Sequence, residues 1–156
     1  MQKITSMLWY DNQAEQAAKL YTSIFKNSKI LQTSYYPKGS PGQAESVMTV
    51  EFKILGQRFV ALNAGPQFKF TEAVSFVVEC DNQKEVDYYW DKLTADGGEE
   101  SQCGWLKDKF GLSWQITPKI LNKMVSGKDK KKAQRAMQAM LTMKKIDISE
   151  LKKAVE

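Results

Sequence analysis

The chain has no histidine among its 156 residues, and this absence restricts its chemistry more than any motif it contains. Zinc, copper, nickel and non-haem iron sites rely on imidazole or on clustered thiolates, and only two isolated cysteines, Cys80 and Cys103, are present. Nucleophiles activated by histidine are excluded as well. A general base would have to be a carboxylate, a lysine, a tyrosine or a thiolate. We therefore expect neither a metal ion nor another cofactor.

Two side chains are candidates for catalysis. Cys103, next to Gly104, would serve as a nucleophile or redox thiol, although a free cysteine is more often a small buried hydrophobic residue. Asp108 lies between Lys107 and Lys109, where it could exchange protons with a substrate. Charged residues beside a glycine turn usually form a solvated hairpin tip, and we favour that interpretation for Asp108.

Five aromatic side chains could line a pocket for a flat or apolar ligand, namely Trp9, Phe68, Phe70, Trp105 and Trp114. Such residues also form ordinary cores, and both interpretations stay open. Side chains alternate along a strand, so Trp114 and its neighbour Gln115 face opposite sides. If Gln115 points into a cavity, Trp114 packs against the helices.

A repeat organises the chain. Residues 11–15 read DNQAE, and residues 81–85, which lie 70 positions later, read DNQKE. Each copy follows a short apolar run, at 4–10 and 73–80, and each is followed by apolar residues at helical spacing. The aspartate that begins each copy is expected to cap its helix. The repeat predicts two copies of one folding unit.

Three strands are expected after each helix, because turn residues separate short β-rich runs. We place them at 30–36, 45–55 and 57–63 in the first half, and at 99–103, 105–109 and 112–117 in the second. Each half then reads βαβββ. The sequence predicts an α+β fold in which paired βαβββ modules form a curved eight-stranded mixed sheet around a cavity. The modules would span about 1–66 and 70–118 of one domain, and ligands favour concave places of this kind.

Beyond Pro118 the pattern becomes helical, so residues 119–156 are predicted to form a basic C-terminal extension, with helices at 120–125, at 130–143 and from Asp147. Residues 118–156 hold 11 basic and 4 acidic side chains, which more than accounts for the net charge of +5. An acidic partner or nucleic acid would suit this charge. No aromatic residues interleave with it for base stacking, so we favour a solvated face and do not expect nucleic acid as a partner.

Residues 103–118, CGWLKDKFGLSWQITP, resemble a signature of one branch of the vicinal oxygen chelate (glyoxalase/bleomycin-resistance) superfamily. That branch is PhnB-like, or demethylubiquinone methyltransferase-like. The likeness extends over nearly the whole chain, including the methionine-rich C-terminal helices. It also includes residues 8–11 (LWYD), 61–66 (ALNAGP), 68–70 (FKF) and 86–90 (VDYYW).

The resemblance implies four metal-ligand positions on inner strands, and in this chain neutral residues occupy them. Ser75 stands where metal-bearing members carry a histidine, and Gln115 stands where they carry a glutamate. Thr5 takes the corresponding place on the first strand, and the fourth place falls between Ala61 and Asn63. Hydroxyls and amides are poor ligands for a transition metal, so the resemblance implies a fold that has lost its metal.

We therefore predict a metal-free protein that binds a small molecule. Polar groups would hold the head of the ligand and aromatic groups its body. The predicted ligand-binding residues are Thr5, Trp9, Asn63, Phe70, Ser75, Trp105 and Gln115.

One alternative is a metal-independent enzyme that acts through Cys103 or Asp108 on a quinone-like or electrophilic substrate. A second is a module that binds nucleic acid or an acidic partner. The branch label suggests methyl transfer, but a Rossmann-type methyltransferase needs a glycine-rich loop after its first strand. Residues 10–13 contain no glycine. We therefore interpret the label as inherited, because a fold does not establish an activity.

We expect a cytoplasmic homodimer without membrane association. No apolar segment suggests a signal peptide or approaches the ~20 residues of a membrane span, and two cysteines do not make a disulfide framework. The extension carries more apolar residues than a solvated tail requires, which suggests an interface. The alternative is that they pack onto the chain's own sheet. These residues are Met137, Met140, Leu141, Met143 and Ile146.

Overall fold

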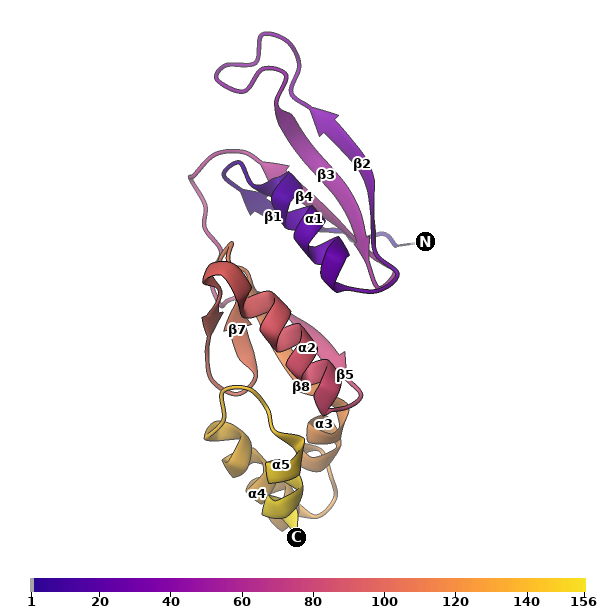
Figure 1. Cartoon of the computed structure of the whole chain (residues 1–156), viewed down its shortest axis with the longest axis vertical. Coiled ribbons are helices and arrows are strands. Elements are labelled where there is room, and N and C mark those ends of the chain that lie inside the picture. Colours follow the sequence, from indigo (N-terminus) through magenta and orange to yellow (C-terminus); the bar gives the residue numbers. More distant parts are fainter. Residues whose placement is uncertain (1) are drawn as a thin grey trace. The chain divides into compact units, whose positions relative to one another are not determined.

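The computed structural model describes residues 2–156 and has an α+β fold made of two compact units, Met1–Lys69 and Phe70–Glu156 (Figure 1). Each unit contains one four-stranded mixed sheet. The predicted fold class and the predicted repeat are confirmed, because both units contain the same βαβββ sequence of elements. The joining of the two sheets into one curved sheet stays a prediction.

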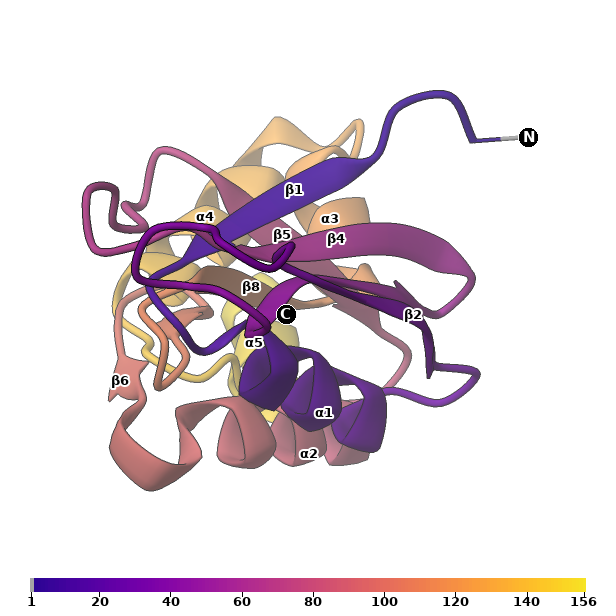
Figure 2. The same ribbon diagram turned by 90° about the horizontal axis from the view of Figure 1, so that it is seen from above.

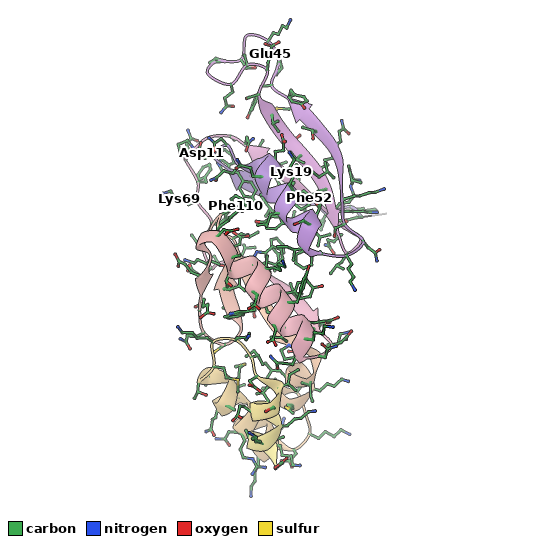
Figure 3. All side chains as sticks on the ribbon, in the orientation of Figure 1. Asp11, Lys19, Glu45, Phe52, Lys69 and Phe110 are labelled. Atoms are coloured by element: carbon green, nitrogen blue, oxygen red, sulfur yellow. The ribbon has the colours of Figure 1, made fainter. Side chains whose placement is uncertain are left out.

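The first unit contains five elements in the predicted order. They are β1 (Ser6–Tyr10), α1 (Ala14–Ile24), β2 (Lys29–Tyr35), β3 (Val47–Ile54) and β4 (Gln57–Asn63). The strand order is β1-β4-β3-β2, in which β1 runs parallel to β4 and the remaining neighbours are antiparallel. Glu45 lies in the long loop that joins β2 to β3 (Figure 3).

The core of the first unit lies between α1 and one face of its sheet (Figure 2). Small alanines on the buried side of α1 let the helix approach closely, and Tyr21 of α1 packs beside Phe52 with ring centroids 6.1 Å apart. Phe52 stacks in turn on Phe59 of β4 at 5.5 Å. Because α1 is the one helix within residues 2–69, the other face of this sheet carries no helix of the unit.

The second unit repeats the arrangement with β5 (Ser75–Cys80), α2 (Gln83–Thr94), a short 3₁₀ turn at Ala95–Gly97, β6 (Glu99–Glu100), β7 (Trp105–Lys107) and β8 (Ser113–Pro118). The strand order β5-β8-β7-β6 matches that of the first sheet, again with one parallel pair, β5 with β8. The strands β6 and β7 are shorter than the strands predicted at 99–103 and 105–109. Cys103 and Gly104 have positive φ values of 58° and 82° and therefore cannot continue an extended strand.

The expected capping by the two repeat aspartates is wrong. In the second unit Asn82 is the cap, because its side chain accepts from the backbone N–H of Glu85, and Glu85 in return accepts from the N–H of Asp81. In the first unit no cap side chain bonds the helix. The N–H of Ala14 instead donates to Asn63 Oδ1 at 2.8 Å.

The extension consists of α3 (Lys119–Val125), α4 (Lys130–Leu141) and α5 (Ile148–Val155), and it packs on the second unit. The N–H groups of Cys103 and Gly104 donate to the carbonyls of Met143 and Lys144, each at 2.8 Å. Gln83 of α2 bonds the backbone on both sides of Asp147. The predicted cap of α5 is confirmed, because Asp147 Oδ1 accepts from the N–H of Glu150.

Much of the apolar surface that suggested an interface is used inside the extension. Ile146 forms a buried cluster with Leu121 and Leu151, and Met140 and Met143 pack against this cluster. Only Met137 and Leu141 of the five residues are well exposed, at 47% and 58%. The argument for a dimer from these residues is therefore weakened, and the homodimer stays a prediction. Among residues 2–156, no helix combines the length and the apolar character needed to cross a membrane.

Candidate functional site

The second sheet has two different faces. Val78, Leu106, Trp114 and Ile116 point towards α2 and are buried. The alternate residues of β5, β7 and β8 form what we call the helix-free face, and the strand register places them side by side. They are Ser75, Val77, Glu79, Trp105, Lys107, Ser113, Gln115 and Thr117.

Three of the seven predicted ligand-binding residues meet on this face. Gln115 Nε2 donates to Ser75 Oγ at 2.9 Å, so two of the positions implied by the resemblance contact each other directly. Trp105 is the register partner of Gln115 on β7, and Val77, which is 55% exposed, is its partner on β5. An amide therefore lies between an indole and an aliphatic side chain.

The expectation for Trp114 is confirmed. Gln115 lies on the helix-free face, and Trp114 is buried on the opposite side, where its ring lies 5.7 Å from that of Phe76. Trp114 therefore belongs to the core of the second unit.

Trp9 lies on the first unit, on the face of its sheet away from α1. Its indole Nε1 donates to the carbonyl of Gly65 at 2.9 Å, and its ring meets Phe68 edge-on at 4.9 Å. Trp9 thus holds the segment that follows β4. Thr5 is exposed just before β1, and Phe70 is a half-buried residue at the start of the second unit.

Asn63 has a structural role in the first unit. It lies on the side of β4 that faces α1 and is 8% exposed. Its Oδ1 accepts from Ala14 N at 2.8 Å, and its Nδ2 donates to the carbonyl of Val47 at 3.1 Å. These bonds fix the start of α1 against β3 and β4, so we remove Asn63 from the candidate site.

The expected solvated hairpin tip at Asp108 is wrong, because Asp108 is only 2% exposed. One carboxylate oxygen accepts from the N–H groups of Phe110 and Leu112 at 2.9 and 3.1 Å, and the other accepts from Trp114 Nε1 at 3.0 Å. Buried charges persist where hydrogen bonds compensate them. Asp108 therefore holds the β7–β8 turn together and is poorly placed to exchange protons with a substrate.

Cys103 is half-buried at the junction with the extension, where its backbone bonds Met143. Cys80 is fully buried, and burial, followed by the nearby carboxylates of Glu85 and Asp81, raises the pKa of its thiol to about 12. The thiolate is the reactive form.

We therefore expect iodoacetamide at neutral pH to leave Cys80 unmodified in the folded protein and to label it after denaturation. Peptide mass spectrometry before and after urea measures this. Labelling of Cys80 in native buffer as fast as in urea would contradict the buried position.

The first unit contains a cavity of about 590 Å³ that the sequence reasoning missed. It lies between the start of α1 and the loop before β3, and Asp11 at its rim is visible in Figure 3. Its wall includes Glu15, Tyr36, Gln43 and Asn63. Tyr36 donates from its hydroxyl to the carbonyl of Asn63, so part of the polar lining is already bonded within the unit. In the sequence, this loop was indicated only by the Gly-Ser-Pro-Gly run at 39–42.

The donor set does not fit the divalent metal of the superfamily. Ser75 and Gln115 offer a hydroxyl and an amide that bond each other, and neither is a good transition-metal ligand. Within residues 2–156, no three His, Cys, Asp or Glu side chains are grouped closely enough to share a metal ion. We derive no reaction step through a metal.

Comparison with known proteins shows the superfamily and the family to which the chain belongs. The paired βαβββ units place the chain in the vicinal oxygen chelate superfamily, to which PhnB and FosX proteins belong. The chain belongs to the 3-demethylubiquinone-9 3-methyltransferase family, whose model matches residues 2–117. None of the curated proteins compared with the chain gives a match.

Solved structures agree with this assignment. The PhnB protein from Bacillus cereus is 36% identical, with a TM-score of 0.68, over 75% of this chain and 99% of its own. Protein PA1353 from Pseudomonas aeruginosa has 14% identity and a TM-score of 0.63 over 76% and 98% of the two chains. The fosfomycin resistance protein FosX from Listeria monocytogenes has 15% identity and a TM-score of 0.52 over 76% and 93%. The latter two show the fold alone.

The extent of these matches corrects one expectation. The likeness was expected to include the C-terminal helices, but the family model ends at residue 117. The PhnB protein from Bacillus cereus is covered almost completely by three quarters of this chain. The helices α3, α4 and α5 therefore lie outside the matched region.

Proposed function

We propose that the helix-free face of the second sheet binds a small organic molecule without a metal ion. The observation that carries the proposal is the Gln115–Ser75 hydrogen bond beside Trp105 on the helix-free face of the sheet. A polar pair flanked by an indole is typical of ligand sites, where a few polar groups orient a ligand within apolar walls. Gln115 Oε1 and the Ser75 hydroxyl would bind polar atoms, and the Trp105 ring would contact a flat body.

Binding, rather than catalysis, is the function that the residues support. The carboxylate of Asp108 accepts three hydrogen bonds inside the fold, and Cys103 has no histidine partner because the chain contains none. The family name specifies methyl transfer, but the junction between β1 and α1 lacks the glycine loop of a Rossmann-type methyltransferase. We therefore do not extend that activity to this chain.

A thermal-shift screen of small aromatic compounds tests the binding site. A compound that raises Tm is expected to lose most of its effect with Gln115→Leu, because an apolar side chain cannot orient its polar group. The matched control is Gln32→Leu, on the exposed strand β2 of the first unit. Equal shifts for both variants and the parent protein would contradict the proposed site.

Elemental analysis tests the absence of metal. We expect the purified protein to contain far less than one transition-metal ion per chain, and EDTA to leave its Tm unchanged. A stoichiometric metal that EDTA removes together with thermal stability would show that the donor set has been misread.

A further inference from the structure

Ser113, the first residue of β8, has a hydroxyl that nothing in the fold explains. The residue is 1% exposed, and its Oγ is the one buried side-chain oxygen or nitrogen within residues 2–156 that has no hydrogen-bond partner. Buried hydroxyls normally have a partner, and leaving one unpaired is unfavourable. Ser113 lies on the helix-free face, two residues before Gln115. The Ser113 hydroxyl is therefore free to form a hydrogen bond with a bound molecule.

The strand register places Ser113 in a row of three donors. Its partner on β5 is Ser75, and its partner on β7 is Lys107. Because Ser75 Oγ accepts from Gln115, the Ser75 hydroxyl proton remains to be donated. Two hydroxyls and an ammonium group therefore lie across β5, β8 and β7. The adjacent row holds Val77, Gln115 and Trp105, so a donor-rich row borders an apolar one.

Lys107 already binds a carboxylate. Its Nζ lies 2.5 Å from Glu72 Oε1, and Glu72 comes from the segment just before β5. The hydrogen bond between them lowers the pKa of the Glu72 carboxyl and raises the pKa of the Lys107 ammonium. β8 lies between β5 and β7, so this pair links the two sides of the donor row. Ion pairs this exposed contribute little to stability, and another carboxylate can replace Glu72 at small cost.

We propose that the ligand carries a carboxylate, which displaces Glu72 from Lys107 and accepts hydrogen bonds from the hydroxyls of Ser75 and Ser113. This inference rests on the function proposed above and specifies its ligand class. The flat body of the acid lies along the next row, beside Trp105 and Val77. Without ligand, the Glu72 carboxylate binds Lys107 in place of the ligand carboxylate. The Ser113 hydroxyl favours ligands that carry a carboxylate.

The test compares 2-naphthoate with 2-naphthamide, which share a flat body and differ in the charge of the head. Each is titrated into the full ¹⁵N-labelled chain, and the indole N–H signal of Trp105 is followed after assignment with Trp105→Phe. We expect naphthoate to bind at least about tenfold more tightly than naphthamide. Glu72→Gln is expected to strengthen naphthoate binding several-fold, because it removes the competing carboxylate, and to leave naphthamide unchanged.

Two further variants make the test specific. Glu79→Gln, at the far end of the same face, removes the same charge away from the donor row and should leave naphthoate affinity nearly unchanged. Ser113→Ala should weaken naphthoate by at least about tenfold, since it removes one hydrogen bond to a charged group. If both compounds shift the Trp105 signal and bind with equal affinity, the proposal of a carboxylate ligand is wrong. The proposal that this face binds small molecules is then retained. If neither moves it, both proposals fail.

Discussion

Replacement of Asp108 by alanine is expected to destabilise the protein by about 4 kcal/mol, since each buried donor left without a partner costs roughly 1–3 kcal/mol. The variant would leave three donors unpaired in the β7–β8 turn, namely the N–H groups of Phe110 and Leu112 and the indole of Trp114. Urea unfolding followed by tryptophan fluorescence measures the change.

Two companion variants separate this explanation from a general effect of lost charge. Asp108→Asn keeps an acceptor for the two backbone N–H groups but turns an NH₂ group towards Trp114, so about half of the loss is expected. Asp91→Asn, on the exposed side of α2, changes the same functional group outside the turn and should alter stability by no more than about 0.5 kcal/mol. Equal, small effects for Asp108→Ala and Asp91→Asn would contradict the buried hydrogen-bond network.

Gly104→Ala is expected to cost about 3 kcal/mol, from two additive causes. The residue has φ = 82°, which costs an L-residue roughly 1–2 kcal/mol. An added Cβ would also lie 2.8 Å from the carbonyl oxygen of Ile116 and 3.1 Å from Ile146 Cγ1, and overpacking of this kind costs about 1–3 kcal/mol.

Gly111→Ala is the matched control for this substitution. Gly111 has a similar φ of 85°, but a Cβ there would meet nothing within 4 Å, so only the backbone cost of about 1 kcal/mol is expected. Because Gly104 N also donates to Lys144 O, the larger loss should be accompanied by faster hydrogen exchange in residues 143–146. If the two alanine variants are equally stable, the close contact between Gly104 and the extension is wrong.

The sequence predicted the architecture well because the repeat and its periodicity are local properties. The DNQ segments, the alternating strands and the glycine turns each occupy a few neighbouring residues, and the structure places two βαβββ units over them. The pairing of Ser75 with Gln115 could also be anticipated, since the family pattern assigned both to one site and the strands bring them together.

The misassigned residues depended on contacts that a linear pattern does not contain. Asn63 ends a strand whose sequence is compatible with either face of the sheet for its side chain. Only the packing of α1 shows that Asn63 lies on the side of the helix. Asp108 was considered solvated because it lies between two lysines, yet its three donors come from residues two to six positions later and close a turn around it. Ser113 was overlooked although alternation places it beside Gln115, because a buried hydroxyl becomes informative only when its missing partner is known.

The most direct test of the proposed binding face is an NMR screen of the full ¹⁵N-labelled chain against a small-molecule library, in buffer containing EDTA. We expect at least one compound to shift the side-chain amide of Gln115 and the indole N–H of Trp105 together, without added metal. Compounds that shift only groups around the first-unit cavity, such as the amide of Gln43, would contradict it. So would binding that appears at Gln115 only after a divalent metal is restored.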